Sequence, residues 1–149
     1  DNGIYVRDSC STTDNLRANS SGNPANYQTA SLYLYKQLSG DTNANFQPPA
    51  GARSYFTFKP QMLEGPRDSN GNLTGVSYIK DPFASSYGYS TAYANYLDEL
   101  AGTPPCYVAP NPGATVRGYN PTFDLWSTAG LTADPGSPDT ITPQWIKNW

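Results

Sequence analysis

Apolar positions recur at helical spacing in one stretch of the chain, residues 23–40, which read NPANYQTASLYLYKQLSG. Asn23 suits the N-cap of a helix, Pro24 suits the first helical position, and Gly40 suits the C-terminal stop. A helix over this stretch has an apolar stripe that it must bury against the rest of the protein. The residues of this stripe are Tyr27, Ala30, Leu34 and Leu38.

Alternating patterns further along the chain predict β-strands. In the first of these stretches Phe56 and Phe58 share one face, and in the second Val76 and Tyr78 share one face while Ile79 lies on the other. A short strand at residues 4–6 is also predicted. The four longer stretches are RSYFTFK at 53–59, GVSYIK at 75–80, SSYGYST at 85–91 and TFDLWST at 122–128.

The last of these strands places Phe123 and Leu125 on one side and Asp124 and Trp126 on the other. Between the last two strands, residues 92–120 form an insertion, with one or two helical turns predicted at 92–100. The order of a helix followed by hairpin-linked strands indicates an α+β fold with an antiparallel sheet. We expect residues 1–149 to form a single domain, and we find no internal repeat.

Composition places the chain among folded proteins and excludes several functions. Of 149 residues, 37% are hydrophobic and 14% are charged, so the chain has enough apolar material for a core. The net charge is −3 and the nine Lys and Arg residues are scattered, which argues against nucleic acid as a partner. No apolar run approaches the roughly 18 residues of a membrane span. The chain opens on a polar stretch, DNGIYVRDSC, as if an upstream segment had been removed.

The residue types of common catalytic sites are scarce. The sequence has no histidine and no G-x-S-x-G motif, so the usual activated nucleophiles cannot be assembled. We therefore expect no enzyme activity. Cys10 and Cys106 are either two unrelated side chains or one disulfide that closes a long loop, and their spacing does not suit a metal site. Carboxylates that could meet in a hydrolase cleft are Glu64, Asp98, Glu99 and Asp124, although surface roles explain most of them.

Three oxygen-rich loops invite a calcium interpretation, because calcium binds about six to eight oxygen ligands. They are DTNAN from Asp41, DSNGN from Asp68, and residues 131–143. The first two lack the glycine and the glutamate of a calcium loop, and Asn70–Gly71 is better explained as a turn with positive φ. The third loop combines three prolines with several side-chain oxygens. By composition alone, a loop of this kind is more often a rigid loop without a metal than a calcium site.

Three stretches stand out in order along about the last 70 residues, namely DPFASSYGYST at 81–91, FDLWSTAG at 123–130 and WIKNW at 145–149. Together they resemble the C-terminal half of the major pseudopilin of type II secretion systems. The stretch NYQTASLYLYKQLSGD adds weaker support. The residues that match the family pattern are Asp81, Pro82, Phe83, Tyr87 and Tyr89, then Asp124, Leu125, Trp126 and Ser127, and finally Ile146, Asn148 and Trp149.

The resemblance implies a pilin-like fold, in which a helix packs on a small antiparallel sheet with long loops and a C-terminal tail. It implies a structural subunit that assembles with other pseudopilin subunits on an inner-membrane secretion platform. In such proteins a hydrophobic N-terminal helix, absent from this chain, is the membrane anchor, and the globular domain lies in the periplasm or in an extracytoplasmic filament.

The resemblance also implies a calcium ion in the loop after the last strand. Asp134 and Asp139 are the matching acids, and the backbone carbonyls near Leu131 and Ser137 complete the candidate set. This chain has STAGLTADPG where the family pattern is S-L-G-A-D-G, so the spacing of the ligands differs from that pattern. The ion would have a structural role.

Two tryptophans in the last five residues leave two interpretations open. Trp145 and Trp149 can anchor the C-terminal segment on the sheet, because an indole ring buries a large apolar area and its N–H can reach a carbonyl. Alternatively, they can form an exposed platform of a calcium-dependent carbohydrate-binding or adhesive module outside the cell. Burial of the tryptophans distinguishes the two. A secreted hydrolase is the third and weakest interpretation.

Overall fold

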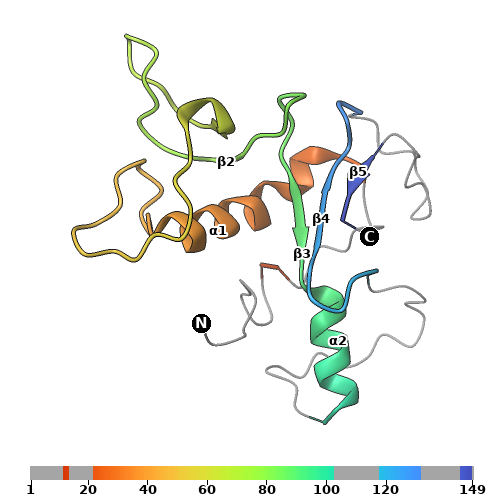
Figure 1. Ribbon diagram of the computed structural model, residues 1–149. Coiled ribbons are helices and arrows are strands. Elements are labelled where there is room, and N and C mark those ends of the chain that lie inside the picture. The colour runs from red at the N-terminus through yellow and green to blue at the C-terminus, as the bar shows by residue number, and fades with distance from the viewer. Residues whose placement is uncertain (1–11, 14–21, 103–117, 132–144, 149) are drawn as a thin grey trace.

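The computed structural model describes residues 12–13, 22–102, 118–131 and 145–148. Over these residues the fold is mixed α/β, with two α-helices and two small antiparallel sheets (Figure 1). No helix in this part of the chain has the length and apolar character needed to cross a membrane. The predicted strand at residues 4–6 lies outside the described residues.

The first helix begins and ends where the sequence predicts. A 3₁₀ turn, η1 (Pro24–Tyr27), leads into α1 (Gln28–Ser39), and the side-chain oxygen of Asn23 accepts a hydrogen bond from the N–H of Ala25 at 3.0 Å. Gly40 follows the helix with φ of 76°, which a glycine adopts without strain. A Cβ at this position would also lie 2.7 Å from the carbonyl oxygen of Arg53. Local signals therefore define both ends of this helix.

The buried face of α1 differs in part from the predicted stripe. Tyr27 and Ala30 are buried as expected, but Leu34 and Leu38 are only half-buried. The side chain that enters the core beside them is Tyr35, which is 1% exposed. The other buried residues of the helix are small and polar, namely Ser31 and Ser39.

Small polar residues on α1 allow a strand to approach the helix closely. The hydroxyl of Ser31 accepts a hydrogen bond from the N–H of Ile79 at 2.9 Å and lies 3.4 Å from the carbonyl oxygen of the same residue. Ile79 belongs to β2 (Tyr78–Ile79), which pairs antiparallel with β1 (Leu63–Glu64). A short 3₁₀ turn, η2 (Pro60–Met62), precedes β1.

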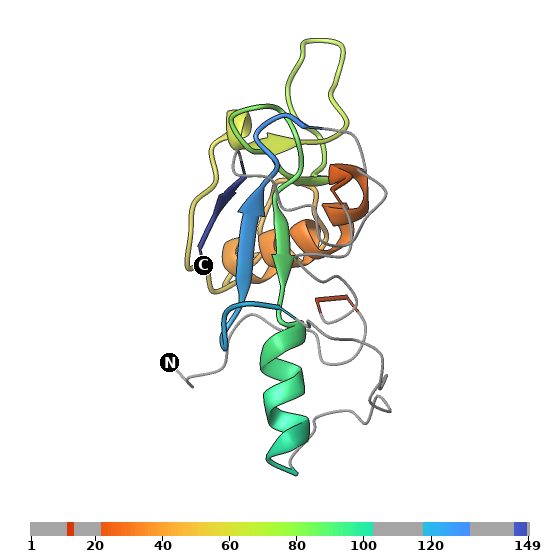
Figure 2. The same cartoon turned by 90° about the vertical axis from the view of Figure 1, so that its right-hand side faces the viewer.

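The second sheet contains the two predicted strands nearest the C-terminus of the chain, together with a short strand at 146–147 that the sequence pattern does not predict. Its order is β3 (Gly88–Ser90), β4 (Asp124–Ser127) and β5 (Ile146–Lys147), all antiparallel. The helix α1 packs against β2 of the first sheet and β3 of the second (Figures 1 and 2). The predicted helical turns at 92–100 form α2 (Ala92–Leu100), which extends from the end of β3 away from α1. The expected helix-on-sheet arrangement is present in this coarse form.

The alternating stretch at 53–59 is not a strand, and that prediction is wrong. The N–H groups of Tyr55 and Phe56 both donate to the carbonyl oxygen of Leu38, at 2.8 and 2.9 Å. The segment therefore pairs with the C-terminal end of α1, where helix carbonyls lack partners within the helix. Phe58 is buried and Phe56 is half-exposed, and their rings meet edge to face with centroids 4.6 Å apart.

The stretch at 75–80 is a strand only at Tyr78–Ile79, and its predicted faces are wrong. Val76 and Ile79 both enter the core, whereas Tyr78 is half-buried. The N–H of Val76 donates to the carbonyl oxygen of Ala44 at 2.8 Å, so the backbone turns before the ladder begins. The buried cluster that results is Tyr35, Phe58, Leu63, Val76 and Ile79.

Candidate functional site

A buried carboxylate joins the stretches 81–91 and 123–130. Asp81 is 3% exposed and lies in the turn between β2 and β3. Its Oδ1 accepts hydrogen bonds from the N–H groups of Phe83 at 2.9 Å and Ser85 at 2.8 Å. Its Oδ2 accepts a short hydrogen bond from the hydroxyl of Ser127, at the end of β4. Asp81 therefore closes its own turn and ties that turn to a strand 46 residues away in sequence.

A second buried carboxylate holds the chain at the other end of β4. Asp124 is 2% exposed, and its two oxygens accept hydrogen bonds from the N–H groups of Tyr119 at 3.1 Å and Asn120 at 2.9 Å. Burial raises the pKa of Asp124, and the two backbone hydrogen bonds oppose that rise. A Cβ at Gly118 would lie 2.6 Å from Oδ2, so a glycine is required where the chain passes the carboxylate.

The C-terminal segment is attached to β4 by one asparagine as well as by the strand β5. The side-chain oxygen of Asn148 accepts from the N–H of Leu125 at 2.9 Å, and its amide donates to the carbonyl oxygen of Phe123 at 3.0 Å. Its own N–H donates to the carbonyl oxygen of Leu125 at 3.2 Å. Asn148 thus extends the β4–β5 ladder with its side chain.

Two tryptophans are buried around this sheet. Trp126 is 1% exposed and meets the ring of Tyr27 edge to face, with centroids 5.1 Å apart. It packs directly over Gly88, where a Cβ would lie 2.0 Å from the indole ring. Trp145 is 6% exposed, which agrees with its predicted role as an anchor of the C-terminal segment. Trp149 lies outside the described residues.

Most of the predicted calcium site lies outside the described residues. This applies to Asp134, Ser137 and Asp139, and likewise to both cysteines, Cys10 and Cys106. Leu131 is described: its side chain is 42% exposed, and its carbonyl oxygen accepts a hydrogen bond from the hydroxyl of Thr128 at 2.7 Å. Across the described ranges, no group of three or more His, Cys, Asp or Glu side chains could hold a metal ion.

The first calcium-like loop uses its carboxylate within the protein. Asp41 is fully buried, accepts a hydrogen bond from the hydroxyl of Tyr35 at 2.8 Å, and accepts a weaker one from the N–H of Asn45 at 3.4 Å. Burial, followed by the neighbouring Asp41, raises the pKa of the Tyr35 phenol. The sequence marked Asp41 only as the start of a weak calcium-like loop and did not predict this pair.

At least two of the four candidate hydrolase carboxylates have structural partners. Glu64 forms an ion pair with Lys80 at 3.2 Å, and the hydrogen bond from Lys80 lowers the pKa of Glu64. Asp124 is occupied by backbone N–H groups, as described above. Asp98 lies on α2, and the side chain of Glu99 is outside the described set. Among the described side chains, the geometry gives no support to a pair of acids that act together on a substrate.

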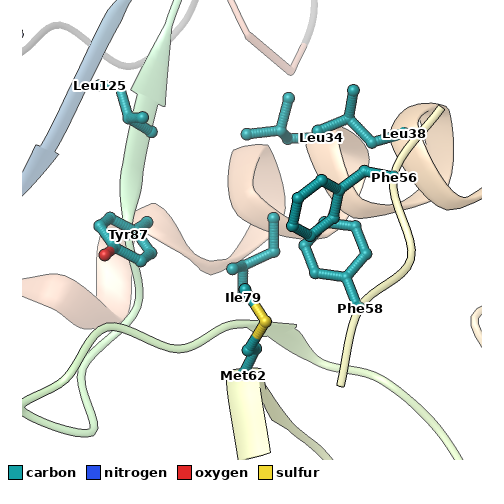
Figure 3. Close-up of a pocket in the computed structure, with 8 residues that line it drawn as sticks. All are labelled: Leu34, Leu38, Phe56, Phe58, Met62, Ile79, Tyr87 and Leu125. Carbon is teal, nitrogen blue, oxygen red and sulfur yellow. The ribbon is translucent and has the colours of Figure 1, made fainter. Parts of the chain in front are cut away.

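An apolar groove of about 200 Å³ opens between α1 and the two sheets (Figure 3). Tyr87 supplies the one hydroxyl among its lining residues, and burial, followed by the charge of Asp81, raises the pKa of that phenol. The groove can therefore accept an apolar group but offers no acid, base or nucleophile at neutral pH. Its lining residues are Leu34, Leu38, Phe56, Phe58, Met62, Ile79, Tyr87 and Leu125.

No protein-family model matches this chain, and no curated protein or solved structure matches it either.

Proposed function

We propose that this chain is the globular domain of a structural subunit of a type II secretion pseudopilus or a related pilus-like filament. In this proposal it assembles with other pseudopilin subunits on an inner-membrane platform, with the domain in the periplasm or in the extracytoplasmic filament. Its role is structural and not catalytic.

The observation that carries the proposal is the hydrogen bond between Asp81 and Ser127. Asp81 opens the D-P-F stretch and Ser127 ends the D-L-W-S stretch, and these are the two stretches on which the resemblance rests. A shared structural role explains why both residue types occur in this order, since each satisfies the other in a buried place. The packing of α1 against β2 and β3 and the pairing of β5 with β4 further support the proposal.

A structural calcium ion in the loop that follows Leu131 is part of the same proposal. Asp134, Asp139 and carbonyl oxygens near Leu131 and Ser137 would hold it, since these are the hard oxygen ligands that calcium prefers. Such an ion would fix the path of the chain between β4 and β5. Its effect would be to position Trp145 against the sheet.

The competing function is a calcium-dependent carbohydrate-binding module. Such a module needs exposed aromatic faces, and among the described tryptophans Trp126 and Trp145 are 1% and 6% exposed. Neither can serve as a platform for a sugar ring without moving out of the core. This observation favours the filament subunit over the carbohydrate-binding module.

The proposal is tested with the complete gene product in its own cells, together with its secretion genes. An affinity tag is inserted at the exposed hairpin tip of residues 69–71, and the surface filaments are sheared off and probed for the tag. Recovery of the protein in filaments, lost when the assembly platform is deleted, would support the proposal. Release of a soluble monomer that binds a glycan array in a calcium-dependent way would replace it with the carbohydrate-binding function.

A further inference from the structure

Residues 65–75 form a hairpin that projects from the body of the protein between β1 and β2 (Figures 1 and 2). A β-bridge joins Arg67 to Leu73, and the N–H of Asp68 donates to the carbonyl oxygen of Asn72 at 2.9 Å. At the tip, Gly71 has φ of 83°, and no atom lies near the position of an added Cβ. The tip therefore combines an exposed surface with a defined backbone.

The tip carries the dipeptide Asn70–Gly71, which has an intrinsic chemistry. The backbone nitrogen of Gly71 can attack the side-chain carbonyl carbon of Asn70, because glycine has no side chain that hinders the approach. A new C–N bond forms, the bond from that carbon to the side-chain nitrogen breaks, and ammonia leaves with the proton from the Gly71 amide. Water then opens the cyclic imide at either carbonyl, which gives aspartate or isoaspartate at position 70.

The hairpin holds both the attacking nitrogen and the peptide group that follows it. The N–H of Gly71 donates to the carbonyl oxygen of Asp68 at 3.0 Å. The carbonyl oxygen of Gly71 accepts a hydrogen bond from the guanidinium of Arg67, also at 3.0 Å. The nitrogen that must attack is therefore engaged, and the peptide plane that contains it cannot rotate toward the Asn70 side chain without breaking the hydrogen bond to Asp68.

The Asp68 side chain restrains the residues around this peptide. Its Oδ1 accepts from the N–H of Asn70 at 2.9 Å and from the N–H of Asn72 at 2.8 Å, while Oδ2 accepts from the side-chain amide of Asn72 at 3.0 Å. These hydrogen bonds lower the pKa of Asp68, the side-chain bond from Asn72 most of all, so the clamp stays charged at neutral pH. A negative charge at this place also disfavours loss of the Gly71 amide proton, which the attack requires.

We propose that Asn70 is a latent deamidation site that the Asp68 clamp keeps closed in the folded protein. The sequence alone predicts rapid deamidation at an exposed Asn–Gly pair, and the hydrogen bonds of the hairpin predict the opposite. Once the clamp opens, formation of isoaspartate lengthens the main chain by one carbon. The N–H of Asn72 can then no longer reach the Asp68 side chain in the same register, so the clamp does not form again after the change.

The test measures deamidation in the whole chain at slightly alkaline pH, by peptide mapping with mass spectrometry and chromatographic separation of the isoaspartate form. The same chain is incubated in buffer and in concentrated urea. Asn2–Gly3 is the same dipeptide elsewhere in the sequence and calibrates the rate in urea, where the two sites should react alike. In buffer, Asn70 should react about tenfold or more slowly than in urea, the factor expected when a hydrogen bond of ordinary net strength must open first.

Three variants separate the effect of the Asp68 clamp from general exposure of the tip. Asp68→Ala should raise the rate at Asn70 in buffer about fivefold or more and leave the rate in urea unchanged. Ser69→Ala is the matched control in the same turn and should react like the original chain. Asp68→Asn keeps one side-chain carbonyl oxygen as an acceptor and should give an intermediate rate. Unchanged thermal midpoints would show that the hairpin, and not the whole domain, has opened.

Equal rates at Asn70 in buffer and in urea would overturn the proposal outright. A normal slow rate in Asp68→Ala would also overturn it, because the side chain would then not be the guard. If Asp68→Ala unfolds the domain, the Asp68→Asn rate decides the question.

Discussion

Replacement of Asp81 is the sharpest test of the structural role assigned to the junction between the β2–β3 turn and β4. Asp81→Ala removes the acceptor of three hydrogen bonds, from the N–H groups of Phe83 and Ser85 and from the hydroxyl of Ser127. Hydrogen bonds to a charged acceptor contribute about 1.5 to 3 kcal/mol each. Because the turn lies at the surface, water can reach its N–H groups, and the lower value applies. We therefore expect a loss of about 4 kcal/mol in the free energy of unfolding.

Asp81→Asn is the informative companion variant. Its side-chain carbonyl oxygen can still accept from the two turn N–H groups, and the hydroxyl of Ser127 can rotate to accept from the new amide. The loss should therefore fall to about 1 to 2 kcal/mol, the difference between charged and neutral hydrogen bonds. Ser127→Ala should cost a similar amount, and the double variant should cost less than the sum of the two, since both remove the same interaction.

The assay is equilibrium unfolding in urea, followed by the fluorescence of the buried tryptophans and by far-UV circular dichroism. Coincident transitions would justify a two-state treatment. Gln61→Ala, at an exposed site outside the junction, serves as the control and should change the stability by no more than about 0.5 kcal/mol. The reasoning is refuted if Asp81→Ala is as mild as this control, or if Asp81 and Ser127 prove additive in the double variant.

Three further predictions concern the sheet and the loop that follows it. Burial raises the pKa of Asp124, so the folded state binds the carboxyl proton more tightly than the unfolded state does. The contribution of Asp124 to the free energy of unfolding therefore falls as pH rises above the ordinary Asp pKa of about 3.9. Asp124→Asn should remove that part of the pH dependence, as measured by parallel urea titrations of both proteins from acid to neutral pH. An unchanged dependence of stability on pH in the variant would contradict the burial argument. Gly88→Ala places a Cβ only 2.0 Å from the Trp126 ring and should cost about 3 kcal/mol or more, with a shifted tryptophan emission; a neutral effect would contradict the packing. If the loop holds calcium, an ion concentration a hundredfold above Kd should add about 2.7 kcal/mol, and chelator or Asp139→Ala should remove it; calorimetry that detects no binding at millimolar calcium would dismiss the site.

The sequence by itself determined the elements whose signals are local. The helix α1 has its cap at Asn23 and its stop at Gly40, and these act through backbone groups within a few residues. The turn at Gly71 needs a positive φ, which glycine supplies. Such features do not depend on which distant segment comes to lie beside them.

The tertiary structure decided the partners of the extended segments. Residues 53–59 have the alternation of a strand, but the N–H groups of Tyr55 and Phe56 donate to the carbonyl oxygen of Leu38 at the end of α1. Likewise, the N–H of Val76 donates to the carbonyl oxygen of Ala44. Val76 and Ile79, expected on opposite faces of one strand, both enter the core. An extended backbone presents the same N–H and C=O groups whatever it pairs with. The alternation of apolar residues therefore does not predict which segment an extended stretch pairs with.

The same reasoning explains why the junction could be only half predicted. Asp81 and Ser127 stood out by their place in two recognisable stretches, yet nothing in the sequence showed that they meet. A carboxylate in a polar loop is usually a surface group, and only packing reveals that Asp41, Asp81 and Asp124 are buried. Burial of a charge becomes tolerable when several N–H or O–H groups converge on it, and that convergence is a property of the folded chain.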